Sequence, residues 1–196
     1  DVGITEILVI TGTEHMGDMI SLLGSGEKYG CSFTFKVQEN ANGIADALRL
    51  AKNFIVDDDF IVLLGDNMFE DGLENYIKQY YESGCDCMLL LKKVPDPERY
   101  GVAVINDGVL VKAVEKPLEP ISDLCITGIY MYDSSVFNRI SKLKPSSRGE
   151  YEITEVNNSY IKDMSVSFCV MDGWWTDAGT HESYRKANLL VSEGNV

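Results

Sequence analysis

Two aspartates that lie far apart in the sequence have the side chains and positions best suited to hold a divalent cation. Asp66 follows a predicted strand at 60–64, and Asp177 follows a predicted strand and precedes a predicted helix. Ligands of open α/β sheets bind at the carboxyl ends of strands, and Mg²⁺ prefers carboxylate oxygens beside substrate phosphates. The sequence therefore indicates one shared metal site. The competing interpretation is that Asp66 serves a turn and that Asp177 or Thr180 only caps the last helix.

A second candidate site surrounds a predicted β-hairpin. Glu115 and Lys116 end its second strand, where a carboxylate can accept hydrogen bonds from sugar hydroxyls and an ammonium group can contact a phosphate. Gly101 begins the first strand and could present a backbone amide to a ligand. A solvated ion pair on an edge strand and an ordinary turn are the alternatives at these positions.

A third candidate site combines a glutamine with a glycine. Gln38 ends a predicted strand, and its amide offers a donor and an acceptor together, which suits the edge of a nucleobase. Gly43 begins a predicted helix, whose amino end would favour phosphate. The alternative is a capped loop that binds nothing.

Strand-like and helix-like segments alternate in the first half of the chain, which favours an α/β fold with a mostly parallel sheet. Apolar or alternating runs predict strands at 6–10, 32–37, 60–64 and 85–94, and amphipathic spacing predicts helices at 14–23, 44–55 and 72–82. In the second half, Asn106-Asp107-Gly108 predicts a hairpin between strands 101–105 and 109–114. Strands are then expected at 124–132 and 166–170, and helices at 134–143, 152–162 and 181–191. We expect Asp133 to cap the helix at 134–143 and Thr180 to cap the last one.

The composition excludes several classes of protein. The chain has 196 residues, of which 45% are hydrophobic, and a net charge of −14. That surface disfavours nucleic acid and anionic lipid as partners, and a bound phosphate would need local positive charge or a metal ion. The apolar runs are too short for a membrane span. Five cysteines without a recognisable leader favour a reducing cytoplasm.

Taken together, these segments resemble the nucleoside-diphosphate-sugar pyrophosphorylases of the short form. The matching segments, in the order of the family, are 37–38, 43–47, 64–67, 96–102, 115–117, 127–130, 147–154 and 175–181. The segments at 96–101 and 148–150 favour the glucose-1-phosphate thymidylyltransferase branch over the uridylyl and adenylyl branches. The resemblance implies a three-layer, Rossmann-like nucleotidyltransferase fold with a β-hairpin insertion for the sugar.

The resemblance also assigns roles to residues. It makes Asp66, Lys116 and Asp177 catalytic, and Asp66 and Asp177 the ligands of Mg²⁺. It places the nucleotide against Gln38, Gly43, Asp66 and Asn67. It places the sugar phosphate against Asn67, Tyr100, Gly101, Glu115, Lys116, Ile126 and Arg148. The implied substrates are dTTP and glucose 1-phosphate, and the implied assembly is a homo-oligomer.

One element of the family has no counterpart in these residues. The family carries an amino-terminal strand, a Gly-rich loop with an arginine and a Pro-Lys segment, and nothing in the sequence matches them. We therefore expect residues 1–196 to be a single nucleotidyltransferase domain without its first strand, its Gly-rich loop and its first helix. By itself this chain is expected to be nearly inactive.

The implied reaction is nucleotidyl transfer, which needs positioning and charge neutralisation rather than a covalent intermediate. Uridylyl and adenylyl transfer by the same fold remain alternatives. A further alternative is a relative without catalytic activity that binds sugar nucleotides or regulates a partner. The presence of both Asp66 and Asp177 argues against that last alternative, because a purely structural protein would not need both.

Overall fold

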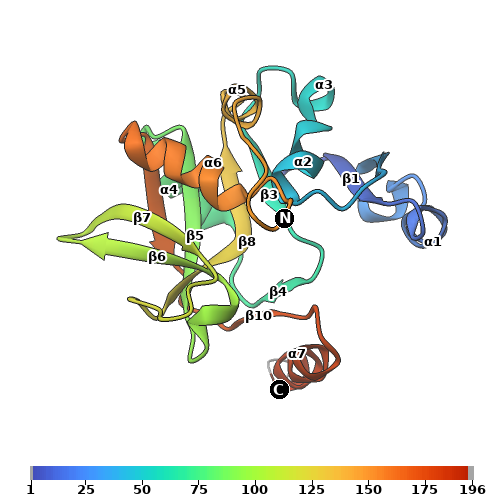
Figure 1. Ribbon diagram of the computed structural model, residues 1–196. Coiled ribbons are helices and arrows are strands. Elements are labelled where there is room, and N and C mark those ends of the chain that lie inside the picture. The colour runs from blue at the N-terminus through green and yellow to red at the C-terminus, as the bar shows by residue number, and fades with distance from the viewer. Residues whose placement is uncertain (1, 194–196) are drawn as a thin grey trace. The chain divides into compact units, whose positions relative to one another are not determined.

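The computed structural model describes residues 2–193, which form two compact units. Within the described residues, unit 1 comprises 2–58 and 134–156, and unit 2 comprises 59–133 and 157–193. Each unit is described by itself, and Figure 1 labels most of their elements. None of the helices within residues 2–193 is long and apolar enough to cross a membrane.

Unit 1 contains a small parallel sheet. Strand β1 (Glu6–Gly12) pairs in parallel with β2 (Ser32–Gln38), and α1 (Met16–Leu23) with the 3₁₀ turn η1 (Glu27–Tyr29) connects them. Every residue of these two strands keeps some exposure to solvent. The buried residues of the unit instead lie mainly on two short helices that contact each other, α2 (Ile44–Arg49) and α5 (Val136–Ile140), and within residues 153–156.

The helix predicted at 44–55 is interrupted. The structure has α2 and a second helix, α3 (Lys52–Ile55), with a turn at Leu50 and Ala51 between them. The ammonium group of Lys36 donates a hydrogen bond of 2.8 Å to the carbonyl oxygen of Leu50. That carbonyl is thereby satisfied outside the helical ladder, so the interruption leaves no orphan acceptor there.

Unit 2 is built on a larger sheet, with strands in the order β7-β6-β8-β5-β9. The bounds are β5 (Cys87–Lys93), β6 (Gly101–Asn106), β7 (Val109–Glu115), β8 (Leu124–Tyr132) and β9 (Val166–Val170). Strand β3 (Phe60–Leu63) pairs with the second half of β8, from Ile129 to Tyr132. The short 3₁₀ turn η2 (Pro97–Arg99) leads into β6.

The strand directions correct one part of the sequence-based fold prediction. An α/β fold with a hairpin insertion is confirmed, but the described pairs are mainly antiparallel rather than parallel. Only β1–β2 and β5–β9 run parallel, whereas β8 runs antiparallel to β3, β5 and β6. Strands β7 and β8 both run antiparallel to β6, which lies between them, so β8 runs in the same direction as β7 and opposite to β3, β5 and β6. Strand β8 is buried on both faces, and its continuous apolar sequence therefore looks like that of a parallel strand.

The hairpin itself is confirmed. Its two loop residues, Asp107 and Gly108, both have positive φ angles, of 50° and 78°. These values are those that a two-residue type I′ turn requires, and the Asp-Gly pair tolerates them. Strands β6 and β7 then pair from Gly101 opposite Glu115 to Asn106 opposite Val109.

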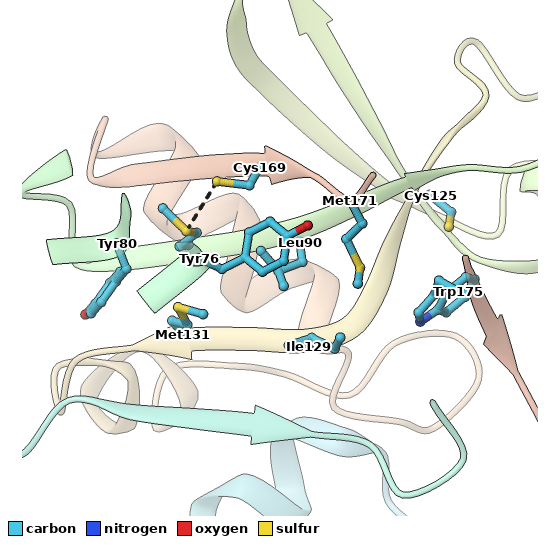
Figure 2. Close-up of a cluster of buried hydrophobic side chains, with 10 residues drawn as sticks. Tyr76, Tyr80, Leu90, Cys125, Ile129, Met131, Cys169, Met171 and Trp175 are labelled. Carbon is cyan, nitrogen blue, oxygen red and sulfur yellow. Dashed lines mark hydrogen bonds between the residues drawn. The ribbon is translucent and has the colours of Figure 1, made fainter. Parts of the chain in front are cut away.

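Helices cover both faces of the unit 2 sheet, which gives this unit three layers (Figure 1). On one face, α4 (Glu74–Ser83) places Tyr76 and Tyr80 against buried side chains of β5 and β8, as Figure 2 shows. On the other face, α6 (Ile153–Lys162) stacks the ring of Tyr160 on that of Tyr132, with centroids 5.7 Å apart. The dense apolar core of the described chain lies between these layers.

Two short strands complete unit 2. Strand β4 (Asn67–Phe69) pairs antiparallel with β10 (Trp175–Asp177), which is followed by α7 (His181–Glu193). Thr180 caps α7 as predicted, since its Oγ1 accepts a hydrogen bond of 3.1 Å from the Ser183 amide. The N-cap residue of α5 is Ser135 rather than the predicted Asp133. Asp133 Oδ1 accepts a hydrogen bond from the Tyr160 hydroxyl.

Candidate functional site

The two predicted metal ligands lie side by side in unit 2. The β4–β10 ladder pairs Asp177 with Asn67, the residue after Asp66, and the Ala178 amide donates to the Asp66 carbonyl at 2.7 Å. Asp66 Oδ2 and Asp177 Oδ1 lie 3.3 and 2.8 Å from one point, the position that a Cβ atom would take on Gly179. The two oxygens are therefore no further apart than the sum of these distances, and a larger residue at 179 would press on both.

Each of these carboxylates has one oxygen held by a nearby donor. Asp66 Oδ1 accepts a hydrogen bond of 2.9 Å from the side-chain amide of Asn67, and Asp177 Oδ1 accepts one of 2.7 Å from the Gly179 amide. The Asp66 residue is exposed, and Asp177 is half-buried. Two fixed carboxylates at the surface can share a hard cation that takes its other ligands from water and phosphate.

The two carboxylates fit a Mg²⁺ site that is completed by substrate phosphates and water, but not a metal site built from protein ligands alone. Among residues 2–193, no group of three or more acidic, histidine or cysteine side chains is placed to hold a metal ion. A structural site with a complete protein cage would need such a group, whereas Mg²⁺ beside a nucleotide commonly uses one or two carboxylates. Asp66 and Asp177 would hold the ion, and its positive charge would offset the negative charge of the phosphates.

The segment that carries Asp177 is fastened along its backbone. The ammonium group of Lys92 donates to the carbonyls of Met171, Asp172 and Gly173, at 2.9, 3.1 and 2.6 Å. On the amide side of the same segment, Asp71 Oδ1 accepts a hydrogen bond of 2.8 Å from the Gly173 amide. These bonds fix where β10 begins, and the β4–β10 register then decides where Asp177 lies.

The residues predicted for the sugar phosphate gather at one end of the hairpin. Gly101 lies directly opposite Glu115 in the β6–β7 ladder, and the Lys116 amide donates to the Tyr100 carbonyl at 3.0 Å. Lys116 has a φ angle of 39°, an uncommon backbone conformation that turns the chain away from the sheet just after Glu115. The register thus brings these four residues together.

Ile126 joins the same end of the sheet through the neighbouring strand. It is buried in β8, one residue after Cys125, which pairs with Val102 of β6. Tyr100 is half-buried, and its ring packs edge-on against that of Trp175, with centroids 5.4 Å apart. Burial raises the pKa of Tyr100 to about 12, so its hydroxyl stays protonated near neutrality and can donate a hydrogen bond.

Gln38 and Gly43 lie together in unit 1. The Gln38 side-chain nitrogen donates to the Gly43 carbonyl at 3.2 Å and to Asp46 Oδ2 at 3.3 Å. Asp46 is buried and also accepts a hydrogen bond from Arg49. Gly43 has a φ angle of 99°, and a Cβ atom there would lie 2.7 Å from the Tyr151 carbonyl oxygen, so only glycine fits.

The Gln38 amide is locked in one orientation by these partners. Both are oxygen acceptors, so the NH₂ group must face them and the carbonyl oxygen must face away. Among the described residues, nothing in the protein donates to that oxygen. The site can therefore offer an acceptor, but no further donor, from this side chain.

Arg148 also belongs to unit 1 and is paired with acidic residues. Its guanidinium group contacts Glu150 at 3.0 Å and Glu152 at 3.7 Å. Its predicted contact with the sugar phosphate stays a prediction, and a phosphate would have to compete with those two carboxylates for it.

Sequence reasoning missed Gly128 and Trp175 as parts of the site. The Gly128 amide and the Trp175 indole N–H both donate to Asn67 Oδ1, at 2.8 and 2.7 Å. A glycine and a tryptophan inside matching motifs were visible in the sequence, but their shared partner depends on the pairing of β4 with β10 and on the packing of β4 beside β8. Only the three-dimensional register brings residues 67, 128 and 175 together.

Comparison with known proteins identifies the family. A family model described as nucleotidyl transferase matches residues 1–194. This chain belongs to the nucleotidyl transferase family. Among curated relatives, it is 38% identical over 98% of its length to a Haloferax volcanii protein named low-salt glycan biosynthesis nucleotidyltransferase Agl11. It is 37% identical over 96% of its length to the glucose-1-phosphate thymidylyltransferase of Neisseria meningitidis.

A solved structure agrees with the assignment of this chain to the nucleotidyl transferase family. A Bacillus anthracis protein, solved in complex with a sucrose as a candidate glucose-1-phosphate thymidylyltransferase, superposes with a TM-score of 0.92 and 50% identity. The match covers 96% of this nucleotidyl transferase chain and 77% of the solved one. The chain spans 55% of the Haloferax relative and 67% of the Neisseria relative.

Proposed function

We propose that this protein transfers a nucleotidyl group from dTTP to glucose 1-phosphate, with Mg²⁺ held by Asp66 and Asp177. The observation that carries the proposal is the convergence of these two carboxylates beside Gly179. The printed names of the Neisseria and Bacillus relatives support the same substrates. The products are dTDP-glucose and pyrophosphate.

The reaction needs no covalent enzyme intermediate. A phosphate oxygen of glucose 1-phosphate forms a bond to the α-phosphorus of dTTP, while the bond from that phosphorus to the bridging oxygen breaks and pyrophosphate leaves. Both nucleophile and leaving group are anions, so the protein contributes positioning and positive charge. Bound Mg²⁺ supplies part of that charge, and the ammonium group of Lys116, at the hairpin end, supplies more.

Glu115 and Gly101 are placed to hold the hexose. They lie opposite each other in the β6–β7 ladder, one with a carboxylate and the other without a side chain that would obstruct a ligand. Sugar hydroxyls donate well to a carboxylate. Ile126 and the Tyr100 hydroxyl line the same end of the sheet, so the hexose would meet one acceptor, one donor and an apolar surface.

The locked Gln38 amide supports a pyrimidine with an N3–H group. Thymine and uracil present that donor between two carbonyls, whereas the equivalent ring nitrogen of cytosine or adenine is an acceptor. An outward-facing Gln38 oxygen can accept from the former and would meet lone pairs on the latter. This argument favours dTTP and UTP equally and also admits guanine, whose N1–H is a donor. The names of the relatives are what favour dTTP, and uridylyl transfer is the second candidate.

Turnover with a panel of nucleotides tests the assignment. The full-length protein would be given glucose 1-phosphate with dTTP, UTP, ATP or GTP, and pyrophosphate release would be measured. We expect dTTP to have the highest kcat/KM and UTP the next highest. ATP as the best substrate would refute the thymidylyl assignment, and galactose 1-phosphate and glucosamine 1-phosphate in place of glucose 1-phosphate test the sugar.

The place of action and the assembly complete the proposal. None of the five cysteines, all of which lie in the described part of the chain, forms a disulfide bond, and three of them are buried, which fits a protein that works in the reducing cytoplasm. That the protein is a homo-oligomer stays a prediction.

A further inference from the structure

The Asn67 side chain is locked at three points in unit 2. Its Oδ1 accepts from the Gly128 amide at 2.8 Å and from Trp175 Nε1 at 2.7 Å, while its Nδ2 donates to Asp66 Oδ1 at 2.9 Å. A backbone amide and an indole N–H can only donate, so the oxygen has to face them. The NH₂ group is therefore directed at the carboxylate, and the amide cannot be flipped without losing all three bonds.

Gly128 lies where β8 changes partners. On one side Cys125 pairs with β6, and on the other Ile129 pairs with β3. The amide of Gly128 falls between these two strands and is satisfied by Asn67 rather than by a neighbouring strand. A Cβ atom at position 128 would lie 2.6 to 2.8 Å from the end of the Asn67 side chain, so the glycine is required for this approach.

Trp175 is a donor held by the packed core. Its side chain is buried, with 7% exposure, and Figure 2 shows it at one end of the apolar cluster, beyond Ile129. Its ring packs edge-on against Tyr100, and its backbone pairs with Phe69 in the β4–β10 ladder. The indole N–H is therefore a fixed donor, since neither the ring nor the strand can move without disturbing the core.

We propose that Asn67 and Trp175 are positioning residues that orient the Asp66 carboxylate toward a divalent cation. The indole holds the amide, the amide holds Asp66 Oδ1, and Asp66 Oδ2 is left directed at the point it shares with Asp177. Partners of this kind orient metal ligands, and their loss typically costs about 10–100-fold in metal affinity or activity. The inference rests on the proposed metal site at Asp66 and Asp177.

The arrangement also restricts what Asn67 can offer a substrate. Its oxygen already accepts two hydrogen bonds, and one of its two N–H groups is given to Asp66. Among the described residues, no protein acceptor takes the other N–H. Asn67 can thus donate once to a ligand oxygen, but it cannot accept a hydrogen bond from a sugar hydroxyl.

Trp175→Phe tests the positioning role, and Trp174→Phe is its matched control. The chain has two tryptophans. Among the described residues, the Trp174 indole N–H has no hydrogen-bond partner, whereas that of Trp175 donates to Asn67 Oδ1. Mn²⁺ would be titrated into the full-length protein with dTTP present, and the free ion would be measured by electron paramagnetic resonance. We expect Trp175→Phe to weaken Mn²⁺ binding about 10-fold and Trp174→Phe to leave it within about twofold.

A second variant separates the N–H group from the packing of the ring. In the Trp174→Phe background, Trp175 would be replaced by benzothienylalanine, which has the same shape but carries sulfur where indole carries N–H. The same loss of Mn²⁺ affinity is expected, with no change in melting temperature beyond that of the background. In the protein with an unmodified Trp175, the NMR resonance of the Trp175 indole N–H should shift when Asn67 is replaced by leucine (Asn67→Leu).

Two outcomes overturn the inference, and they can be told apart. If Asp66→Asn abolishes Mn²⁺ binding but neither change at Trp175 affects it, the metal site stands and the positioning role is wrong. If neither Asp66→Asn nor Asp177→Asn weakens Mn²⁺ binding, the proposed metal site fails, and the positioning role fails with it.

Discussion

The two units hold a side-chain amide in opposite senses. In unit 1 the Gln38 NH₂ group is directed at protein oxygens, so its carbonyl oxygen is left for a ligand. In unit 2 the Asn67 oxygen is directed at protein donors, so an N–H is left. The same functional group thus serves as an acceptor in one unit and as a donor in the other, and its fixed neighbours decide which.

The units also differ in how deeply the residues that orient Gln38 and Asn67 are packed. Of the two donors to the Asn67 oxygen, Gly128 belongs to β8, whose last eight residues are all buried, and Trp175 is itself buried. Gln38 ends a strand of a two-stranded sheet in which no residue is fully buried. Precise orientation in unit 2 therefore rests on a packed core, whereas in unit 1 it rests on a few local hydrogen bonds.

Removing a carboxylate from unit 2 should have the largest effect. Asp66→Asn and Asp177→Asn keep the shape of the side chain but remove the charge that would hold Mg²⁺. We expect each to lower kcat by roughly 10²–10³-fold, the scale seen when one electrostatic contact to a transition state is lost. Melting temperatures should stay close to that of the wild type, because neither side chain is buried. A loss of activity that follows unfolding would contradict this expectation.

Truncation of one leucine in each unit tests whether unit 2 is more tightly packed than unit 1. Leu90→Ala empties space in the unit 2 core and should cost about 2–5 kcal/mol of unfolding free energy. Leu8→Ala, on the partly exposed β1 strand, should cost less than about 1.5 kcal/mol. Urea denaturation followed by circular dichroism would measure both. Equal losses would show that unit 1 is packed as tightly as unit 2.

Glu115→Gln should weaken binding of the sugar phosphate in unit 2. Hydrogen bonds to a charged group contribute about 1.5–3 kcal/mol, so the KM for glucose 1-phosphate should rise by roughly 10–100-fold. The KM for dTTP serves as the internal control and should change little. A rise confined to the KM for dTTP would place Glu115 at the nucleotide instead.

Gln38→Leu should produce the smallest change and the opposite pattern. Loss of one neutral hydrogen bond, worth about 0.5–1.5 kcal/mol, should raise the KM for dTTP by roughly 2–10-fold. The KM for glucose 1-phosphate should be unaffected. If both KM values rise together, Gln38 supports the structure of unit 1 rather than reading the base.

Local signals in the sequence predicted the parts of the structure that depend on local chemistry. Asn106-Asp107-Gly108 predicted the hairpin, and Thr180 predicted the cap of α7, because turn and cap preferences act over a few residues. The bounds of β8 and β9 agree with the prediction as well. Asp66 and Asp177 were predicted as metal ligands from their positions after strands and from the family resemblance, and that role stays a prediction.

The remaining features depend on pairing between distant segments. Strands β4 and β10 have three residues each, too few to show a periodic pattern, yet their register is what brings Asp66 and Asp177 together. The role of Gly128 was hidden because its φ angle is ordinary and only the approach of Asn67 requires a glycine. The antiparallel direction of β8 was missed for a similar reason, since burial on both faces gives it the sequence of a parallel strand.

Cleavage of the backbone by bound iron is the most direct test of a shared cation at Asp66 and Asp177. Fe²⁺ would replace Mg²⁺ in the full-length protein with dTTP present, ascorbate and peroxide would start local oxidation, and the fragments would be identified by mass. We expect paired cuts near residues 66 and 177, both suppressed by excess Mg²⁺ and by either Asp→Asn substitution. Cuts near only one of these positions, or at neither, would contradict the account.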